Sequence, residues 1–131
     1  MQLDTQSPAI LLIEMDEMTL EIYQRELSKS FTVFAVTELS RVFEILTNRD
    51  IQAIIIEPEI QGGQGWELIP SINSTFPDRH HPVIVCSTRD AQNEGLGGEV
   101  KKYLTKPVLP RRLRVVSLEV LKSKKISRKI S

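Results

Sequence analysis

The sequence predicts a doubly wound α/β domain, in which a parallel sheet of five strands is covered by helices on both faces. Short apolar runs of strand length alternate along the chain with longer segments of helical periodicity, as in proteins built from strand–helix units. One run, Ala53 to Ile56, is unbroken and rich in isoleucine, which is typical of a strand whose sheet is buried on both sides. A chain of 131 residues, 40% of them hydrophobic, is the right size for one compact domain.

Five strands are predicted from apolar runs that end at polar residues. In chain order they cover residues 10–13, 31–36, 53–56, 82–86 and 101–105. Each run is followed by a segment able to form a helix, so the strands run in one direction and the crossovers between them are right-handed. The carboxyl ends of the strands therefore lie at one edge of the sheet.

The first two helices are predicted from the spacing of their apolar residues. The first helix covers residues 16–28. The residues expected on its core-facing side are Met18, Ile22, Tyr23 and Leu27. The second helix begins after Thr37, whose side chain can cap it. Its apolar residues follow at positions i, i+3, i+4 and i+7: Leu39, Val42, Phe43 and Leu46.

The remaining three helices contain glycine or proline at informative positions. The third, residues 65–74, includes Pro70, which bends a helix unless it lies in the first turn. The fourth, residues 89–98, ends in GLGG and is expected to be short or loose. Pro110 opens the last helix, at a position that tolerates proline. There the expected core-facing residues are Leu109, Leu113, Val116 and Val120, while Val115 and Leu118 face the other way.

Charge is distributed unevenly along the chain, although the net charge is zero. Residues 1–100 carry 16 acids and 6 bases, whereas residues 101–131 carry 11 bases and one acid. We expect a folded domain over residues 1–122 and a basic tail over 123–131. The tail suits contact with nucleic acid or another anionic surface. Because it has no aromatic side chain to stack on a base, a solvated terminus or the start of a linker is the favoured alternative.

Several functional classes are disfavoured by composition. No apolar run approaches membrane-spanning length, and the first ten residues lack the order of a secretory signal. The single cysteine, Cys86, excludes an internal disulfide and fits a reducing compartment, so we expect a cytoplasmic protein. His80 and His81 have no cysteine or acid at ligand spacing, which favours a loop over a metal site.

Polar side chains that can do chemistry follow four of the predicted strands. Glu14 and Asp16 follow the first strand, Glu57 the third, Ser87 the fourth and Lys106 the fifth. Because ligand sites in open α/β sheets gather at the carboxyl ends of the strands, we expect these residues to converge. Carboxylates bind hard divalent cations, and lysine and serine bind oxyanions, so the sequence predicts a site for a cation or a phosphoryl group.

Four stretches give the chain a resemblance to the receiver domains of two-component response regulators. ILLIEMDE resembles the first strand with its acidic cluster, and IIIEPEIQGGQGWEL resembles the third strand, the phosphoacceptor and the following loop. PVIVCST resembles the fourth strand with its switch hydroxyl, Ser87. YLTKPVLPRRL, the most specific match, resembles the fifth strand with its switch aromatic, Tyr103, and the lysine before a cis-proline, Lys106 and Pro107. The resemblance covers Ile10 to about Leu121 and implies the strand order 2-1-3-4-5.

Two positions of the site depart from the pattern of that family. Glu57 stands where the family has its acceptor aspartate, and Met15 stands where it has a metal-binding acid, while Glu14 keeps the outer acidic place. A thioether does not replace a carboxylate toward Mg²⁺, and the extra methylene of Glu57 displaces the attacking oxygen. We therefore expect weak or absent Mg²⁺ binding, no other cofactor, no efficient phosphorylation and no enzymatic activity. Lys106 should instead pair directly with Glu57, with Ser87 close by.

Three functions remain open from the sequence. The chain is a degenerate receiver, or pseudo-receiver, that acts through protein contacts; or an atypical receiver that a histidine kinase still phosphorylates at or near Glu57; or an adaptor whose basic tail binds nucleic acid or an anionic surface. The resemblance also implies a contact face made by the fourth helix, the fifth strand and the last helix, which would bind a signalling or output protein or a second copy. Val115, Leu118 and Tyr103 are the residues expected on it.

Overall fold

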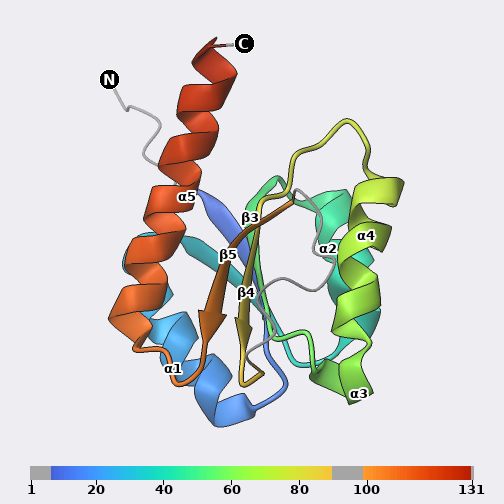
Figure 1. The fold of residues 1–131 in the computed structure, drawn as a ribbon, viewed down its shortest axis with the longest axis vertical. Coiled ribbons are helices and arrows are strands. Elements are labelled where there is room, and N and C mark those ends of the chain that lie inside the picture. The colour runs from blue at the N-terminus through green and yellow to red at the C-terminus, as the bar shows by residue number, and fades with distance from the viewer. Residues whose placement is uncertain (1–6, 90–98, 131) are drawn as a thin grey trace.

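The computed structural model describes residues 7–89 and 99–130, with side chains as far as residue 124. The sheet has five strands in the order β2-β1-β3-β4-β5, and all neighbouring strands are parallel (Figure 1). The predicted fold class and strand order are both confirmed. The strands are β1 (Ala9–Ile13), β2 (Thr32–Val36), β3 (Ile51–Ile56), β4 (Val83–Ser87) and β5 (Val100–Thr105).

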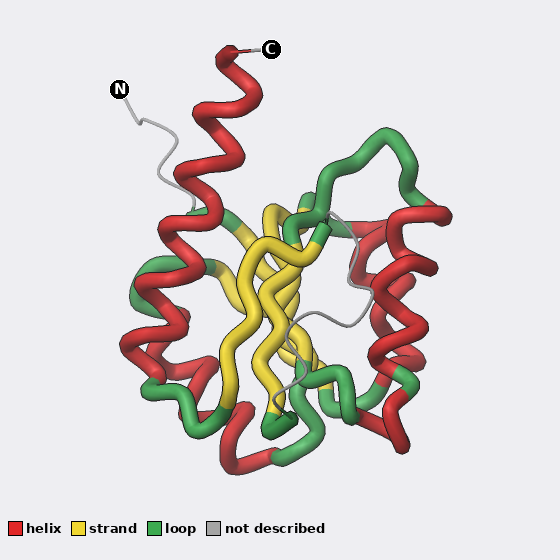
Figure 2. Tube along the Cα trace, viewed as in Figure 1, coloured by secondary structure: helices red, strands yellow, loops and turns green. Residues whose placement is uncertain are grey.

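Helices cover both faces of the sheet (Figure 2). α1 and α5 lie on one face, and α2, α3 and α4 lie on the other. The helix predicted at 89–98 falls outside the described residues, apart from Arg89. The described helices are α1 (Glu17–Leu27), the 3-10 turn η1 (Leu39–Arg41), α2 (Val42–Asn48), α3 (Ile60–Gly63), α4 (Gly65–Thr75) and α5 (Pro110–Ile130).

The central strand β3 contributes to two hydrophobic cores, one on each face of the sheet. Ile54 and Ile56 belong to the core beneath α2 and α4, whereas Ala53 and Ile55 belong to the core beneath α1 and α5. All four side chains are almost completely buried. Each isoleucine contributes about 1.5–3 kcal/mol to stability by leaving water. This explains the unbroken apolar run, because no residue of it faces solvent.

The face of α1 that packs on the sheet differs from the prediction. Tyr23 and Leu27 are buried as expected, but Met18 is 74% exposed and Ile22 is about half exposed. Leu20 packs against the core instead. Residues three and four apart lie on one side of a helix, so a stripe through residues 20, 23 and 27 leaves residues 18 and 22 on the opposite side.

Two helix boundaries show how local chemistry modifies the predicted pattern. Thr37 does not cap the second helix; a 3-10 turn, η1, precedes α2, and Glu38 takes the cap position without a side-chain hydrogen bond. The predicted third helix corresponds to α4, and Pro70 lies inside it. Proline removes one backbone hydrogen bond there. The helix is nevertheless held on the sheet by three buried side chains: Leu68, Ile69 and Ile72.

A glycine-rich turn returns the chain from β3 to α4. Gln61 and Gly62 adopt the left-handed conformation, with φ of 50° and 72°. Gly65 lies so close to the preceding segment that a Cβ atom there would be 2.7 Å from the Cα of Pro58. A glycine is therefore required at residue 65 for α4 to start this close to the end of β3.

Helix α5 runs without a break to Ile130, so the expected basic tail, residues 123–131, is helical as far as residue 130. Its end projects beyond the sheet in Figure 1. Leu109 does not join the core as predicted: it precedes the helix and is 75% exposed. Three predicted core residues are buried: Leu113, Val116 and Val120. In the part of the chain that the structure describes, no helix is long and apolar enough to cross a membrane.

Candidate functional site

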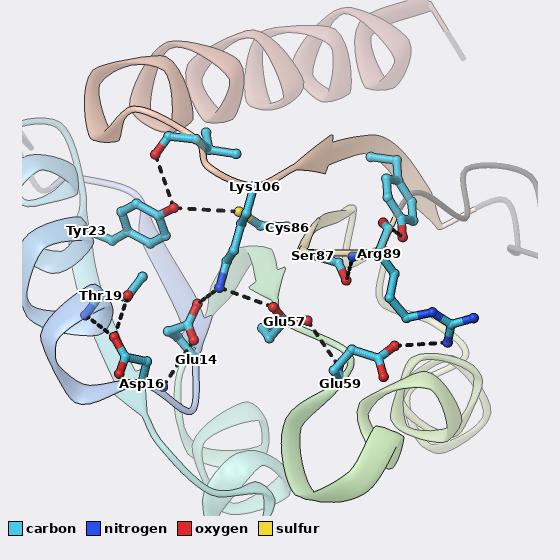
Figure 3. Close-up of polar contacts among 12 residues, drawn as sticks. Glu14, Asp16, Thr19, Tyr23, Glu57, Glu59, Cys86, Ser87, Arg89 and Lys106 are labelled. Carbon is cyan, nitrogen blue, oxygen red and sulfur yellow. Dashed lines mark hydrogen bonds and ion pairs between the residues drawn. The ribbon is translucent and has the colours of Figure 1, made fainter.

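Four of the predicted site residues lie at the carboxyl edge of the sheet. Glu14 follows β1, Glu57 follows β3, Ser87 ends β4 and Lys106 follows β5. Because β1 and β3 are neighbours, Glu14 and Glu57 leave the sheet side by side. Figure 3 shows the Lys106 side chain reaching between these two carboxylates.

Lys106 forms ion pairs with both glutamates. Its Nζ lies 3.1 Å from Oε1 of Glu57 and even closer to Oε1 of Glu14. Both carboxylates are almost completely buried, and the lysine side chain is 14% exposed. The predicted pair of Lys106 and Glu57 is therefore present, but Glu14 extends it to an ion triad (Glu14, Glu57 and Lys106) that the sequence analysis did not foresee.

Backbone N–H groups hold the second oxygen of each carboxylate. Oε2 of Glu14 accepts a hydrogen bond from the N–H of Asp16, and Oε2 of Glu57 accepts one from the N–H of Glu59, both at 3.1 Å. Each carboxylate thus uses one oxygen for Lys106 and the other for the loop that follows its own strand. Buried charges persist when they are both paired and hydrogen-bonded, as here.

The environment of Lys106 keeps its amine protonated. Burial acts to lower the pKa of Lys106, but the hydrogen bonds and negative charges of Glu14 and Glu57 outweigh it and raise that pKa above its ordinary value. With all three groups ionised, the triad carries one net negative charge. Its ammonium group is therefore a permanent cation at the edge of the sheet.

Asp16 does not join the triad, although the sequence placed it in the acidic cluster. Its carboxylate caps α1, accepting a hydrogen bond from the backbone N–H of Thr19 at 2.9 Å and another from the Thr19 hydroxyl. These two hydrogen bonds lower the pKa of Asp16. An exposed aspartate at this position stabilises the first turn of the helix, so its role here is structural.

The residues at this edge do not fit a Mg²⁺ ion well. Met15, at the position that the resemblance assigns to a direct ligand, presents an exposed thioether, a soft group with little affinity for a hard cation. Both oxygens of Glu14 and both of Glu57 already have partners. Among the residues that the structure describes, no group of three or more acidic, histidine or cysteine side chains is placed to hold a metal ion.

Tyr103 and Trp66 stack on each other beside the triad. Their ring centroids are 6.3 Å apart with an interplanar angle of 21°. Nε1 of Trp66 donates to Glu59 at 2.6 Å, and the Tyr103 hydroxyl donates to the backbone oxygen of Arg89 at 2.7 Å. Arg89 closes the network through an ion pair with Glu59 at 3.2 Å. We call these four residues, Glu59, Trp66, Arg89 and Tyr103, the aromatic network.

Glu59 connects the aromatic network to the triad, since its own N–H donates to Glu57. Sequence reasoning missed Glu59 and Arg89, and the Trp66 indole that Glu59 contacts is only partly buried. The sequence did contain one indication of the role of Glu59, which is an acid only two residues after Glu57. An acid at that position is close enough to accept a hydrogen bond from the first turn of α4, as Glu59 does from Trp66.

Ser87 and Pro107 occupy the places that the resemblance assigned to them. The Ser87 hydroxyl is buried and accepts a hydrogen bond from the N–H of Arg89 at 3.1 Å. The peptide bond between Lys106 and Pro107 is cis. The backbone N–H of Lys106 donates to the carbonyl of Ser87 at 2.7 Å, which keeps the ends of β4 and β5 together.

Residues 10–117 match the response regulator receiver domain, and the chain belongs to this family. The match covers all three members of the triad, Ser87, Tyr103 and Pro107. It agrees with the parallel sheet, its strand order and the convergence of the site residues at one edge. No curated protein matches the chain significantly.

Solved structures of other receiver domains share the fold at low sequence identity. A CheY-like receiver domain protein from Methanospirillum hungatei JF-1 superposes with a TM-score of 0.82 at 17% identity, covering 93% of this chain and 99% of that one. The signal receiver domain of an HD domain-containing protein from Pseudomonas fluorescens Pf-5 gives 0.76 at 22% identity, with coverages of 93% and 99%. A receiver domain protein from Clostridium thermocellum gives 0.77 at 19%, with coverages of 91% and 98%.

Removing the cation of the triad should destabilise the fold strongly. Lys106→Met is expected to lower the free energy of unfolding by about 3–5 kcal/mol, because two buried carboxylates lose their counter-charge. Glu57→Gln should restore part of that loss in the Lys106→Met background, which a double-mutant cycle by urea denaturation measures as coupling.

Lys29→Met provides the matched control. Lys29 also pairs with a glutamate, Glu26, at 2.8 Å, but its side chain is mostly exposed. Its removal should cost only about 0–1 kcal/mol. Equal losses from the two lysine substitutions, or a cycle without coupling between Lys106 and Glu57, would show that the triad is screened by solvent.

Proposed function

We propose that this chain is a degenerate receiver, which takes part in two-component-type signalling through protein contacts and without efficient phosphorylation. The observation that carries the proposal is the ion triad. In it, the ammonium of Lys106 is bound to Glu57, the residue at the acceptor position, and to Glu14. A carboxylate paired in this way is a poorer nucleophile toward a phosphoryl donor, because the ammonium group withdraws charge from its oxygens.

The chemistry of phosphoryl transfer supports the same proposal. Catalysis of this reaction consists mostly of positioning and of neutralising charge with a divalent cation. Here Met15 replaces a carboxylate ligand, and the longer side chain of Glu57 moves its oxygens by about a bond length, while misplacements of about 1 Å cost about 10²-fold in rate. We therefore propose that the chain needs no Mg²⁺ and is not an enzyme.

The aromatic network is consistent with a receiver held in one state. Tyr103 is fixed both by stacking on Trp66 and by its hydrogen bond to Arg89. Because Glu59 hydrogen-bonds to both Trp66 and Glu57, the orientation of the tyrosine is linked to a carboxylate with a permanent charge. A permanent ion pair undergoes no change that could move Tyr103. The contact face that includes Tyr103 is therefore expected to be available constitutively.

Treatment with acetyl phosphate and Mg²⁺, followed by intact mass measurement, tests the absence of phosphorylation. We expect no phosphoryl adduct on the wild type, since Glu57 is paired and Met15 is no ligand. The matched variant is Met15→Asp, Glu57→Asp, which restores both acids and should acquire the adduct. An adduct on wild-type Glu57 would contradict the proposal and support the atypical, phosphorylatable receiver.

The contact face proposed for the partner includes the outer side of α5. Val115 and Leu118 are 39% and 40% exposed, one helical turn apart, and are not part of the core. Exposed aliphatic groups that adjoin one another are typical of contact surfaces. We propose that this face binds a second copy of the chain or a signalling partner.

Sedimentation velocity over a range of concentrations tests pairing through α5. The wild type should associate reversibly and without phosphodonor, whereas Val115→Asp, Leu118→Asp should remain monomeric, because a charged group would be buried in the interface. The control is Met18→Asp, Ile22→Asp, which changes an exposed apolar pair on α1 and should associate like the wild type. If wild type and the α5 variant both sediment as monomers, self-association through this face is wrong.

A further inference from the structure

A large hollow lies at the amino edge of the sheet, the edge opposite to the ion triad. It has a volume of about 870 Å³ and is bordered by the end of α4, the segment before β4, the start of β5 and the middle of α5. This size is typical of sites for small organic ligands, which occupy about 300–1,000 Å³. A smaller hollow of about 410 Å³ shares three of its lining residues, His80, His81 and Lys124.

His81 is the buried polar group of this hollow. It is 5% exposed, and its ring contacts the ring of Phe76 edge-on, with centroids 5.9 Å apart. Among the residues that the structure describes, none forms a hydrogen bond with the imidazole. Buried polar atoms are normally paired. Among the described residues, no side-chain nitrogen is both inaccessible to solvent and without a hydrogen-bond partner. The ring nitrogens of His81 therefore open onto the hollows that the residue lines.

A bulge in β5 brings two lysines to the same hollow. Val83 of β4 pairs with Val100, and the next residue, Ile84, pairs with Lys102, so Lys101 is an extra residue in β5. Neighbouring side chains of a regular strand point to opposite faces, and a bulge re-aims them. Lys101 and Lys102 both line the hollow as a result.

A third lysine reaches the hollow from α5. Nζ of Lys124 donates to the backbone oxygen of Gln52 at 3.2 Å, which places its positive charge beside His81. The hollow also has two carboxylates, Glu99 and Glu119, so its three lysines leave one net positive charge. Ammonium groups attract phosphate oxygens, while the carboxylates are able to accept hydrogen bonds from hydroxyl or amino groups of the same ligand.

The protonation of His81 suits such a ligand. Burial lowers the pKa of His81 to about 4, with Lys124, Arg79 and His80 acting in the same direction and Asp50 acting against them. At neutral pH the imidazole is therefore uncharged and has one N–H to donate. An anion bound beside it would offset the surrounding positive charge.

We propose that this hollow is a binding site for a small organic phosphate, whose phosphate group contacts Lys101, Lys102 and the imidazole of His81. The site is separate from the carboxyl edge and does not depend on whether Glu57 is phosphorylated. A receiver with a permanent ion triad would then still have a ligand-dependent input, at the opposite end of the same sheet.

Calorimetric titration of the full chain with adenosine monophosphate (AMP), an organic phosphate of suitable size, tests the site. We expect saturable binding at neutral pH and low salt, weakened about tenfold or more in Lys101→Gln, Lys102→Gln, because two charge-assisted contacts are lost. The control Arg111→Gln, Lys122→Gln removes two exposed charges that do not line the hollow and should leave the affinity within about twofold. Adenosine, which lacks the phosphate, should not bind measurably.

His81 gives a second, independent readout. His81→Phe keeps the ring packed on Phe76 and removes the nitrogens, and it should weaken AMP binding severalfold. In the wild type, NMR titration should show the His81 pKa rise when AMP is saturating, because a bound anion stabilises the imidazolium. The proposal is overturned if AMP shows no saturable binding up to about 10 mM, if adenosine binds equally well, or if the lysine variant and its control behave alike.

Discussion

A carboxylate that leaves water needs a counter-charge, and at the carboxyl edge of this sheet two carboxylates share one, Lys106. Glu14 and Glu57 follow neighbouring strands and are almost completely buried, so neither is stable as an ion without the ammonium group between them. Lys106 follows β5, the edge strand, and spans β4 to reach them. The interaction therefore ties the ends of β1, β3 and β5 together, which constrains the geometry of the whole edge.

The same interaction determines what the loops at this edge are able to do. Because Glu57 is occupied by Lys106 and by the N–H of Glu59, the loop after β3 is held in place, and Glu59 is directed toward Trp66 and Arg89. In a receiver whose acceptor is modified, charge at that place appears and disappears. In the function proposed above, a permanent ion pair takes the place of that change, and the exposed side chains of α5 would form a constant contact surface.

The sequence was sufficient for the features that depend on the burial of a whole strand. The run from Ala53 to Ile56 predicted a strand covered on both faces, and the polar residues after the strands predicted the edge where Glu57 and Lys106 meet. These predictions hold because a strand that is buried on both faces has apolar residues at every position, whatever its neighbours are. The helical spacing of the last helix likewise predicted that Val115 and Leu118 face away from the core, and both are partly exposed.

Features that depend on competition between neighbouring side chains were not predictable in this way. Glu14 and Asp16 are both acids after β1, and only the structure shows that the first faces Lys106 while the second caps α1. The predicted stripe combined Met18 and Ile22 with Tyr23 and Leu27, but only Tyr23 and Leu27 are buried, and Leu20 packs in place of the other two. In both cases residues of similar chemistry lie close together in the sequence, and tertiary packing selects between them.

The protonation equilibrium of Lys106 tests the central claim most directly. Its side-chain amine can be followed by NMR in protein labelled with ¹⁵N-lysine, as the pH is raised through the range where lysine titrates, ordinarily about 10.4. The triad predicts a pKa above that value, which falls toward it in Glu57→Gln. A pKa at or below the ordinary value in the wild type, the result that burial alone would produce, would show that the two glutamates do not hold the ammonium and would contradict the account.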